Sequence, residues 1–87
     1  MDFNCYDAMP SNDEIAIVDQ EAARAAATSL APDVEILGLV MSVPEVFRRG
    51  DMKIVRINLL DGESNDLRAV AARIYKDGEV HEFVCKL

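Results

Sequence analysis

The sequence is poor in several residue types on which common classes of protein depend. Its 87 residues include no tryptophan, one histidine and two cysteines, and nine basic residues face sixteen acidic ones. Because an acidic surface repels phosphate backbones, we expect no nucleic-acid partner. No stretch approaches the roughly 20 apolar residues that span a bilayer, so we expect no membrane association. Hydrophobic residues make up 51% of the chain, which is typical of a folded domain rather than a disordered one.

The two cysteines, Cys5 and Cys85, stand near opposite ends of the chain. The first residues lack the basic start and apolar run of a secretory signal, so we expect a cytoplasmic protein. Thiols stay reduced in that compartment, and we expect both cysteines to be small apolar fillers. A Cys5–Cys85 disulfide is the alternative.

No motif for a cofactor, a nucleotide or a metal ion is present. His81 and Cys85 are four residues apart on a predicted strand, a separation of about 13 Å at ~3.3 Å per residue. That distance is too long for both side chains to hold one metal ion. We therefore expect neither a cofactor nor a metal site.

The negative charge is unevenly distributed. Residues 1–37 contain eight acidic residues and one arginine, whereas residues 38–87 contain eight of each sign. The whole excess of −7 therefore falls in the first 37 residues. A negative surface that keeps a small domain soluble is the ordinary interpretation. The alternative is an acidic inhibitor or decoy that docks on a basic protein partner.

One long helix is predicted in the first half of the chain. Ser11–Glu14 is a capping box, and an alanine-rich stripe follows to about residue 30. Pro32 is expected to stop this helix. The alternative is a short strand at Ile15–Val18, with Asp19 as the helix cap.

Three strands are predicted in the second half. Val34–Val43 shows little alternation of apolar and polar residues, which is typical of a strand buried on both faces. Met52–Leu60 alternates, with Arg56 and Asn58 expected to face water. Glu79–Leu87 is the last strand.

Residues 67–76 fit either a helix that stops at Gly78 or a strand. As a strand they form a hairpin with the last strand, because Asp77-Gly78 is a strong hairpin-turn signal. The hairpin is favoured by two cross-strand pairs of opposite charge, Lys76 with Glu79 and Arg73 with Glu82.

The hairpin gives one α+β domain over residues 1–87, in which residues 1–10 are irregular. An N-terminal helix then packs on a four-stranded antiparallel meander. A helix at 67–76, together with a strand at 15–18, would instead give the ferredoxin-like order βαββαβ.

The order of a long helix and a four-stranded meander over residues 12–87 resembles the cystatin superfamily. Cystatin inhibitors carry Gln-x-Val-x-Gly in the first turn of the meander, where this chain has Val46-Phe47-Arg48-Arg49-Gly50. Only Gly50 matches, and the second turn is Asp77-Gly78 where the inhibitors have Pro-Trp. The resemblance therefore implies a cystatin-like fold without protease inhibition.

The apolar stretch at 34–43 suggests how the chain functions. One helix covers only one face of a sheet, so a second face or an edge stays exposed unless another chain covers it. We therefore expect a non-enzymatic binding domain that forms a homodimer through its sheet. The expected interface residues are Val34, Ile36, Leu37, Leu39, Val40 and Met41.

Two further sites are candidates. A pocket between helix and sheet, expected for a small-molecule binder or a small enzyme, would be lined by His81, Phe83, Ile57 and Val70. Arg48 and Arg49 lie in a predicted turn and are candidates to contact a phosphate or a carboxylate.

Overall fold

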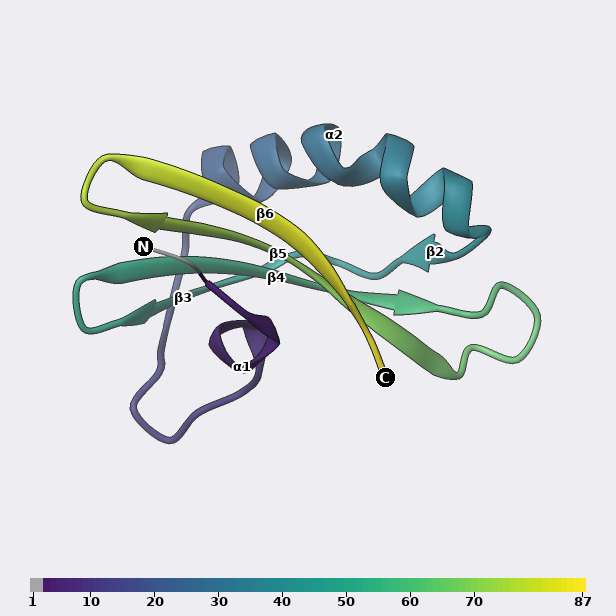
Figure 1. Ribbon diagram of the computed structural model, residues 1–87, viewed down its shortest axis with the longest axis horizontal. Helices are drawn as coiled ribbons and strands as arrows, with labels where there is room; N and C mark the ends of the chain where they lie inside the picture. The colour runs from purple at the N-terminus through teal and green to yellow at the C-terminus, as the bar shows by residue number, and fades with distance from the viewer. Residues whose placement is uncertain (1–2) are drawn as a thin grey trace.

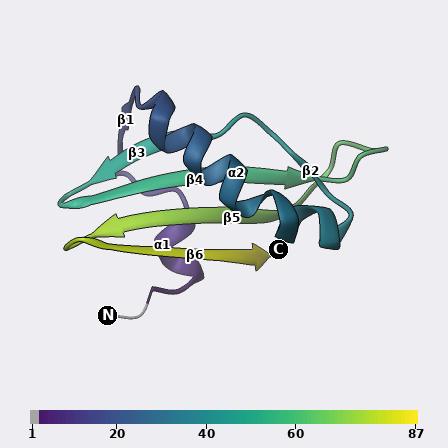
Figure 2. The same ribbon diagram turned by 90° about the horizontal axis from the view of Figure 1, so that it is seen from above.

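A six-stranded antiparallel sheet forms the middle layer of the computed structural model, which describes residues 3–87 (Figure 1). A long helix lies on one face of the sheet and a short helix on the other (Figures 1 and 2). In chain order the elements are α1 (Cys5–Ala8), β1 (Ile15–Ile17), α2 (Gln20–Leu37), β2 (Val40–Met41), β3 (Glu45–Arg49), β4 (Met52–Leu60), β5 (Leu67–Lys76) and β6 (Glu79–Lys86).

The strands pair in the order β1-β3-β4-β5-β6, and the two-residue β2 also pairs with β4. From β3 to β6 each strand pairs with the next strand along the chain, as in a meander. The predicted α+β class and antiparallel sheet are confirmed, with six strands in place of four. No helix in residues 3–87 is both long enough and apolar enough to cross a membrane.

The hairpin predicted at residues 67–76 is confirmed. Asp77 and Gly78 join β5 to β6 with φ values of 52° and 77°, and two positive φ angles in succession define a type I′ turn. Arg73 lies opposite Glu82, as predicted, with Nη1 2.7 Å from the carboxylate. The ferredoxin-like alternative is wrong, because it requires a helix where β5 lies.

Helix α2 begins later than Ser11–Glu14 suggests. Asp19 caps it by accepting the Ala22 N–H at 3.0 Å. Ile15–Ile17 form strand β1 instead of a first helical turn, which confirms the alternative interpretation of this segment. β-Branched residues such as its two isoleucines are enriched in strands.

Pro32 lies inside α2, so the prediction that it stops the helix is wrong. The buried strand predicted at Val34–Val43 is also wrong, because the helix continues to Leu37 and ends at Gly38 in the left-handed conformation (φ 71°). Burial of a stripe with a four-residue spacing outweighs the hydrogen bond lost at the proline. That stripe is Ala22, Ala26, Leu30 and Val34.

Two apolar layers of unequal size lie on the two sides of the sheet. The larger one lies under α2 and contains Ala22, Ala26, Leu30, Val34, Val46, Val55, Ile57, Leu59, Ala69 and Ala71. On the other side Ala8 of α1 packs against Val70 and Ala72, with Phe83 beside them. Successive residues of β4 and β5 thus serve opposite faces.

Leu30 is the largest fully buried residue of α2. We expect Leu30→Ala to lower the free energy of unfolding by about 2–5 kcal/mol, because the smaller side chain leaves a cavity between α2 and the sheet. Ile36→Ala is the matched control, because Ile36 lies on the same helix and is 83% exposed. Urea unfolding of dilute protein should show a change within ~0.5 kcal/mol for this control.

Candidate functional site: a strapped sheet face and an open edge

Residues 3–14 cross the sheet face opposite α2, and we call them the N-terminal strap and that face the strap face (Figure 1). Helix α1 is the central part of the strap. The side chain of Asn4 accepts the Tyr6 N–H at 2.9 Å, and the Asp7 carboxylate accepts the Asn4 N–H at 2.8 Å. Ala8 is fully buried, whereas Tyr6 is 86% exposed. The strap therefore touches the sheet along one narrow side.

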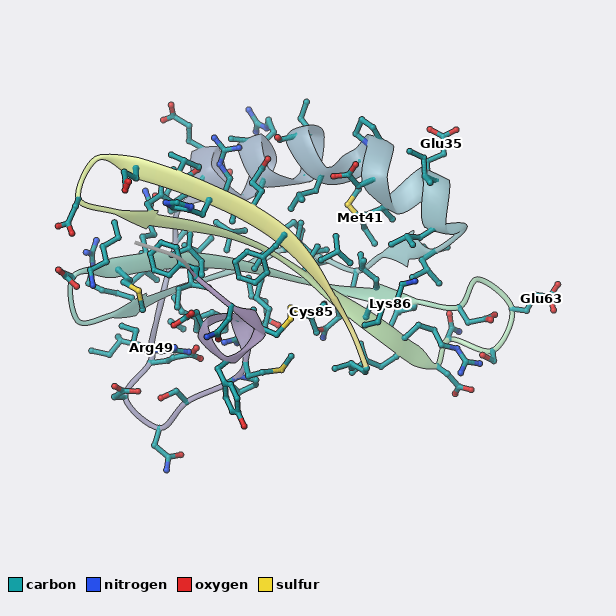
Figure 3. The ribbon with its side chains drawn as sticks, in the orientation of Figure 1. Glu35, Met41, Arg49, Glu63, Cys85 and Lys86 are labelled. Atoms are coloured by element: carbon teal, nitrogen blue, oxygen red, sulfur yellow. A yellow bond between two sulfur atoms is a disulfide. The ribbon has the colours of Figure 1, made fainter. Side chains whose placement is uncertain are left out.

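A disulfide bond between Cys5 and Cys85 ties the strap to β6 (Cys85 is labelled in Figure 3). The prediction that both thiols stay reduced is wrong for this structure. The strap brings Cys5 over the last strand across a sequence separation of 80 residues, and no local pattern reveals that contact. Disulfides persist in oxidising compartments, so the expected cytoplasmic location stays a prediction.

Two arginines of the sheet hold the other end of the strap. Arg56 on β4 donates from Nε to the Ala8 carbonyl at 2.6 Å and from Nη2 to Glu14. Arg49 on β3 donates from Nη2 to the Met9 carbonyl at 2.7 Å and to the same Glu14 oxygen at 2.6 Å. The Glu14 and Arg56 side chains are 6% and 7% exposed. Two guanidinium groups thus share one buried carboxylate.

The surroundings of Glu14 favour its charged form. Burial raises the pKa of this carboxyl, but the hydrogen bonds from Arg56 and Arg49 outweigh burial and hold the pKa below its ordinary value. Arg56 itself lies over the ring of Phe47, with Cζ 4.5 Å from the ring centroid. The prediction that Arg56 faces water is wrong, because the strap covers it and supplies its partners.

His81 also lies under the strap. Its ring contacts the ring of Phe3 edge-on, with the centroids 4.8 Å apart. Its Nε2 atom is buried, 3.7 Å from the Glu79 carboxylate, and has no hydrogen-bond partner within the part of the chain that the structure describes. The strap thus contacts His81 through the ring of Phe3.

The residues predicted to line one pocket lie on two sides of the sheet. Ile57 is fully buried beneath α2. Val70, Phe83 and His81 lie on the strap face, where Phe83 packs near Ala8. The sheet therefore separates Ile57 from the other three residues, and they do not form a common pocket.

The predicted interface residues follow the helix end and β2 rather than one strand. Val34 is buried in the core of its own chain, and Leu37, Leu39 and Met41 are half-buried. Ile36 and Val40 are exposed. Only these two present a large part of their apolar surface to the outside.

Arg49 contacts a carboxylate, the kind of group predicted for it, but the carboxylate is Glu14 of its own chain. Arg48 is exposed and points to the opposite face, because neighbouring residues of a strand alternate. Both arginines belong to β3, whereas the turn follows at Gly50.

The outer side of β6 pairs with no strand of residues 3–87, and we call it the open edge. The Leu87 N–H donates to the Arg68 carbonyl of β5 at 3.1 Å. This bond shows which residues of β6 point their backbone N–H and C=O groups to β5 and which point them away from it. Odd-numbered residues of β6 thus direct their backbone groups to β5. The even-numbered ones direct their N–H and C=O groups outward: Val80, Glu82, Val84 and Lys86.

The hollows on the surface are open and shallow. One of about 330 Å³ adjoins the open edge and is lined by Asp33, Ile36, Leu37 and Val84. Within residues 3–87 no three His, Cys, Asp or Glu side chains gather closely enough to hold a metal ion.

Comparison of the chain with known protein families, curated proteins and solved structures finds no match. The functional argument therefore depends on the residues themselves. Sequence reasoning missed Glu14 and Arg56, although an arginine between Val55 and Ile57 of an apolar strand is a signal for a buried partner.

The noncovalent hold on residues 3–9 is marginal. Ordering this segment costs about 7–14 kcal/mol at ~1–2 kcal/mol per residue. The two arginine hydrogen bonds contribute about 1.5–3 kcal/mol each, and the Ala8 methyl and the Phe3–His81 contact ~1 kcal/mol each. The Cys5–Cys85 disulfide adds a covalent tether to β6 that cannot open unless it is reduced. The covalent bond therefore decides whether the segment stays ordered.

Glu14→Gln should lower the free energy of unfolding by about 3–5 kcal/mol, because it leaves the buried Arg56 without a counter-charge and leaves Arg49 with only the more distant carboxylate of Asp13. Glu63→Gln is the control, since Glu63 lies exposed at the tip of the β4–β5 loop (Figure 3). Chemical denaturation of the two variants under identical conditions measures the difference, and equal stabilities would contradict the shared-carboxylate interpretation.

The pH dependence of stability should follow the same carboxyl. The folded-state pKa of Glu14 lies below the ordinary value of 4.5, so its stabilisation is fully present above pH 4.5 and is lost as the pH falls through the folded-state pKa. Denaturation measured between neutral and acidic pH should show that the free energy of unfolding falls more steeply with decreasing pH in the wild type than in Glu14→Gln. The lowered pKa values of Asp13, Asp19 and Asp61 are common to both proteins.

Proposed function

We propose that this chain is a small non-enzymatic interaction domain that binds a second copy of itself through the open edge of β6. The observation that carries the proposal is the row of outward N–H and C=O groups from Val80 to Lys86. An unpaired edge of this length is a template for another strand. The homodimer expected from the sequence is kept, and its interface moves from residues 34–43 to β6.

Symmetry restricts the possible registers. Two β6 strands related by a two-fold axis run antiparallel, and their outward-facing, even-numbered residues must meet one another. A register centred on Val84 places Glu82 of each copy opposite Lys86 of the other. Opposite charges in directly paired positions stabilise a sheet.

Other registers lack this complementarity. Centring on Glu82 places two carboxylates opposite each other, and centring on Phe83 places Glu82 opposite Val84. Both registers leave Lys86 without an acidic partner, and Lys86 forms no ion pair within residues 3–87. We therefore propose the register centred on Val84.

An apolar patch lies beside this centre. Ile36, 83% exposed at the end of α2, adjoins Val84 and Leu37 around the hollow of about 330 Å³. The two-fold axis through Val84 brings the patches of both copies together on the α2 side of the joined sheet. An interface of one strand and one small patch lies at the lower end of the range of interface sizes, so we expect micromolar affinity.

We further propose a cystatin-like architecture for the domain. Its support is the path of the chain, in which α2 connects the paired strands β1 and β3 and the meander β3 to β6 follows. The β3–β4 and β5–β6 turns, whose sequences include Gly50 and Gly78, lie at the same end of the sheet, on the left of Figure 1. Their sequences lack the inhibitory motifs, so protease inhibition is not part of the proposal.

Val84→Pro tests the use of the edge. The substitution removes an outward N–H and spares the β5–β6 ladder, because even-numbered residues of β6 do not donate to β5. Sedimentation equilibrium at micromolar concentrations should show a monomer–dimer mixture for the wild type and monomer for the variant. Val80→Pro is the matched control: Val80 lies on the same edge but outside the paired stretch, so dimerisation should persist. A monomeric wild type would reject the proposed function.

The register has its own test in the two charged positions. Lys86→Glu should weaken the dimer about tenfold, because Glu82 of each copy then lies opposite an acidic side chain of the other copy, at two places in the interface. Glu82→Lys combined with Lys86→Glu should restore association, although it removes the Arg73–Glu82 contact within each chain. If both proteins dimerise as the wild type does, the register is wrong while the edge remains in use.

A further inference from the structure

The disulfide bond presents its two cysteines unequally. Cys5 belongs to the exposed strap and is itself exposed, whereas Cys85 is 2% exposed on β6 beneath it. A thiolate from solution therefore reaches the sulfur of Cys5 first. The sulfur of Cys85 is then the leaving group.

We propose that Cys5–Cys85 is a thiol-exchange site for dithiol reductants, and that its reduction releases residues 3–9 from the strap face. A thiolate of the reductant attacks Cys5 Sγ, which forms a mixed disulfide and expels the Cys85 thiolate, which then takes up a proton. The second thiolate of the reductant then attacks the sulfur by which the reductant is bound in the mixed disulfide. This step expels the Cys5 thiolate, which also takes up a proton. The reductant leaves as a disulfide, and the protein gains two electrons and two protons.

The point at which release stops is set by the arginine pair. Glu14 stays between Arg49 and Arg56, and the residue after it begins β1, which pairs with β3. Residues 10–13 between the two parts of the strap are exposed and form the hinge. Reduction therefore frees residues 3–9, whose Ala8 and Met9 carbonyls leave Arg56 and Arg49, and it keeps Glu14 in place.

Release changes the chemistry of the strap face. Ala8 leaves its contact with Val70 and Ala72, and Phe3 leaves the ring of His81. An apolar area and an imidazole then face water together. The domain thus presents a covered face where disulfides persist and an uncovered one where dithiols are abundant. Cys85 lies on β6 between Val84 and Lys86, but its side chain is on the strap face, so the argument for release does not use the proposed dimer.

Amide hydrogen exchange on the full chain, with and without dithiothreitol, tests the release. Reduction should speed exchange of the amides in α1 roughly tenfold or more, while β5 amides such as that of Ala71 keep their protection. Cys5→Ser should exchange in the same way without reductant and should not respond to it. Unchanged protection of α1 overturns the proposal. Equal loss of protection in α1 and β5 also overturns it, because the bond would then hold the whole fold and not the strap alone.

The direction of attack has a separate readout. Brief exposure to a monothiol such as glutathione, followed by acid quenching and peptide mass spectrometry, should place the mixed disulfide on Cys5. A predominant adduct on Cys85 would refute the assignment of the attacked sulfur.

Discussion

One carboxylate shared by two arginines organises the side of the molecule opposite α2. Arg56 stands in the middle of β4, where every neighbour along the strand from Ile54 to Ile57 is buried. A buried guanidinium is costly unless a counter-charge and hydrogen-bond acceptors surround it. Glu14 supplies the charge and the carbonyl of Ala8 an acceptor, and both belong to the strap. The route of the N-terminal residues across the sheet therefore follows from the position of one arginine.

The same contact connects the strap to the rest of the fold. Glu14 directly precedes β1, so fixing its carboxylate also fixes where β1 meets β3. Asp19 then caps α2 and binds Lys53 of β4 at 2.9 Å. Within a few residues the chain passes from the strap face, through the edge of the sheet, to the opposite face. An ion pair fixes each end of this short crossing, Glu14 with the arginines at one end and Asp19 with Lys53 at the other. The chain can therefore cover both faces of the sheet.

The parts of the fold that local sequence determines were predictable. The β5–β6 hairpin depends on two turn residues that adopt positive φ and on charges that pair in only one register. The start of α2 was misassigned because Ser11–Glu14 matches a capping box, while Glu14 is held by arginines from distant strands. Pro32 gave a local stop signal that burial of Leu30 and Val34 overrides. Local rules fail here where a contact distant in sequence contributes more free energy.

The candidate site was predictable only in fragments. Arg49 was expected to contact an anion, and it does, but nothing in the sequence pairs it with a residue 35 positions earlier. The Cys5–Cys85 disulfide was the alternative and not the preferred interpretation for the same reason, since the two cysteines are 80 residues apart. The predicted pocket combined Ile57 with Val70 because the sequence of the loop between β4 and β5 does not determine which residues of the two strands pair. A shift of one residue exchanges the two faces of a strand, and the register in fact pairs Val70 with Asn58.

The two edges of the sheet differ in their suitability for a second chain. β1 has three residues between Glu14 and Asp19, within the part of the sequence that holds the whole excess of negative charge. β6 has eight residues, belongs to the half of the chain in which charges balance, and carries both an acid and a base on its outward positions. Two molecules of net charge −7 repel each other most strongly where that charge is concentrated. Strand length and charge therefore both favour β6 over β1 as the edge for the proposed dimer.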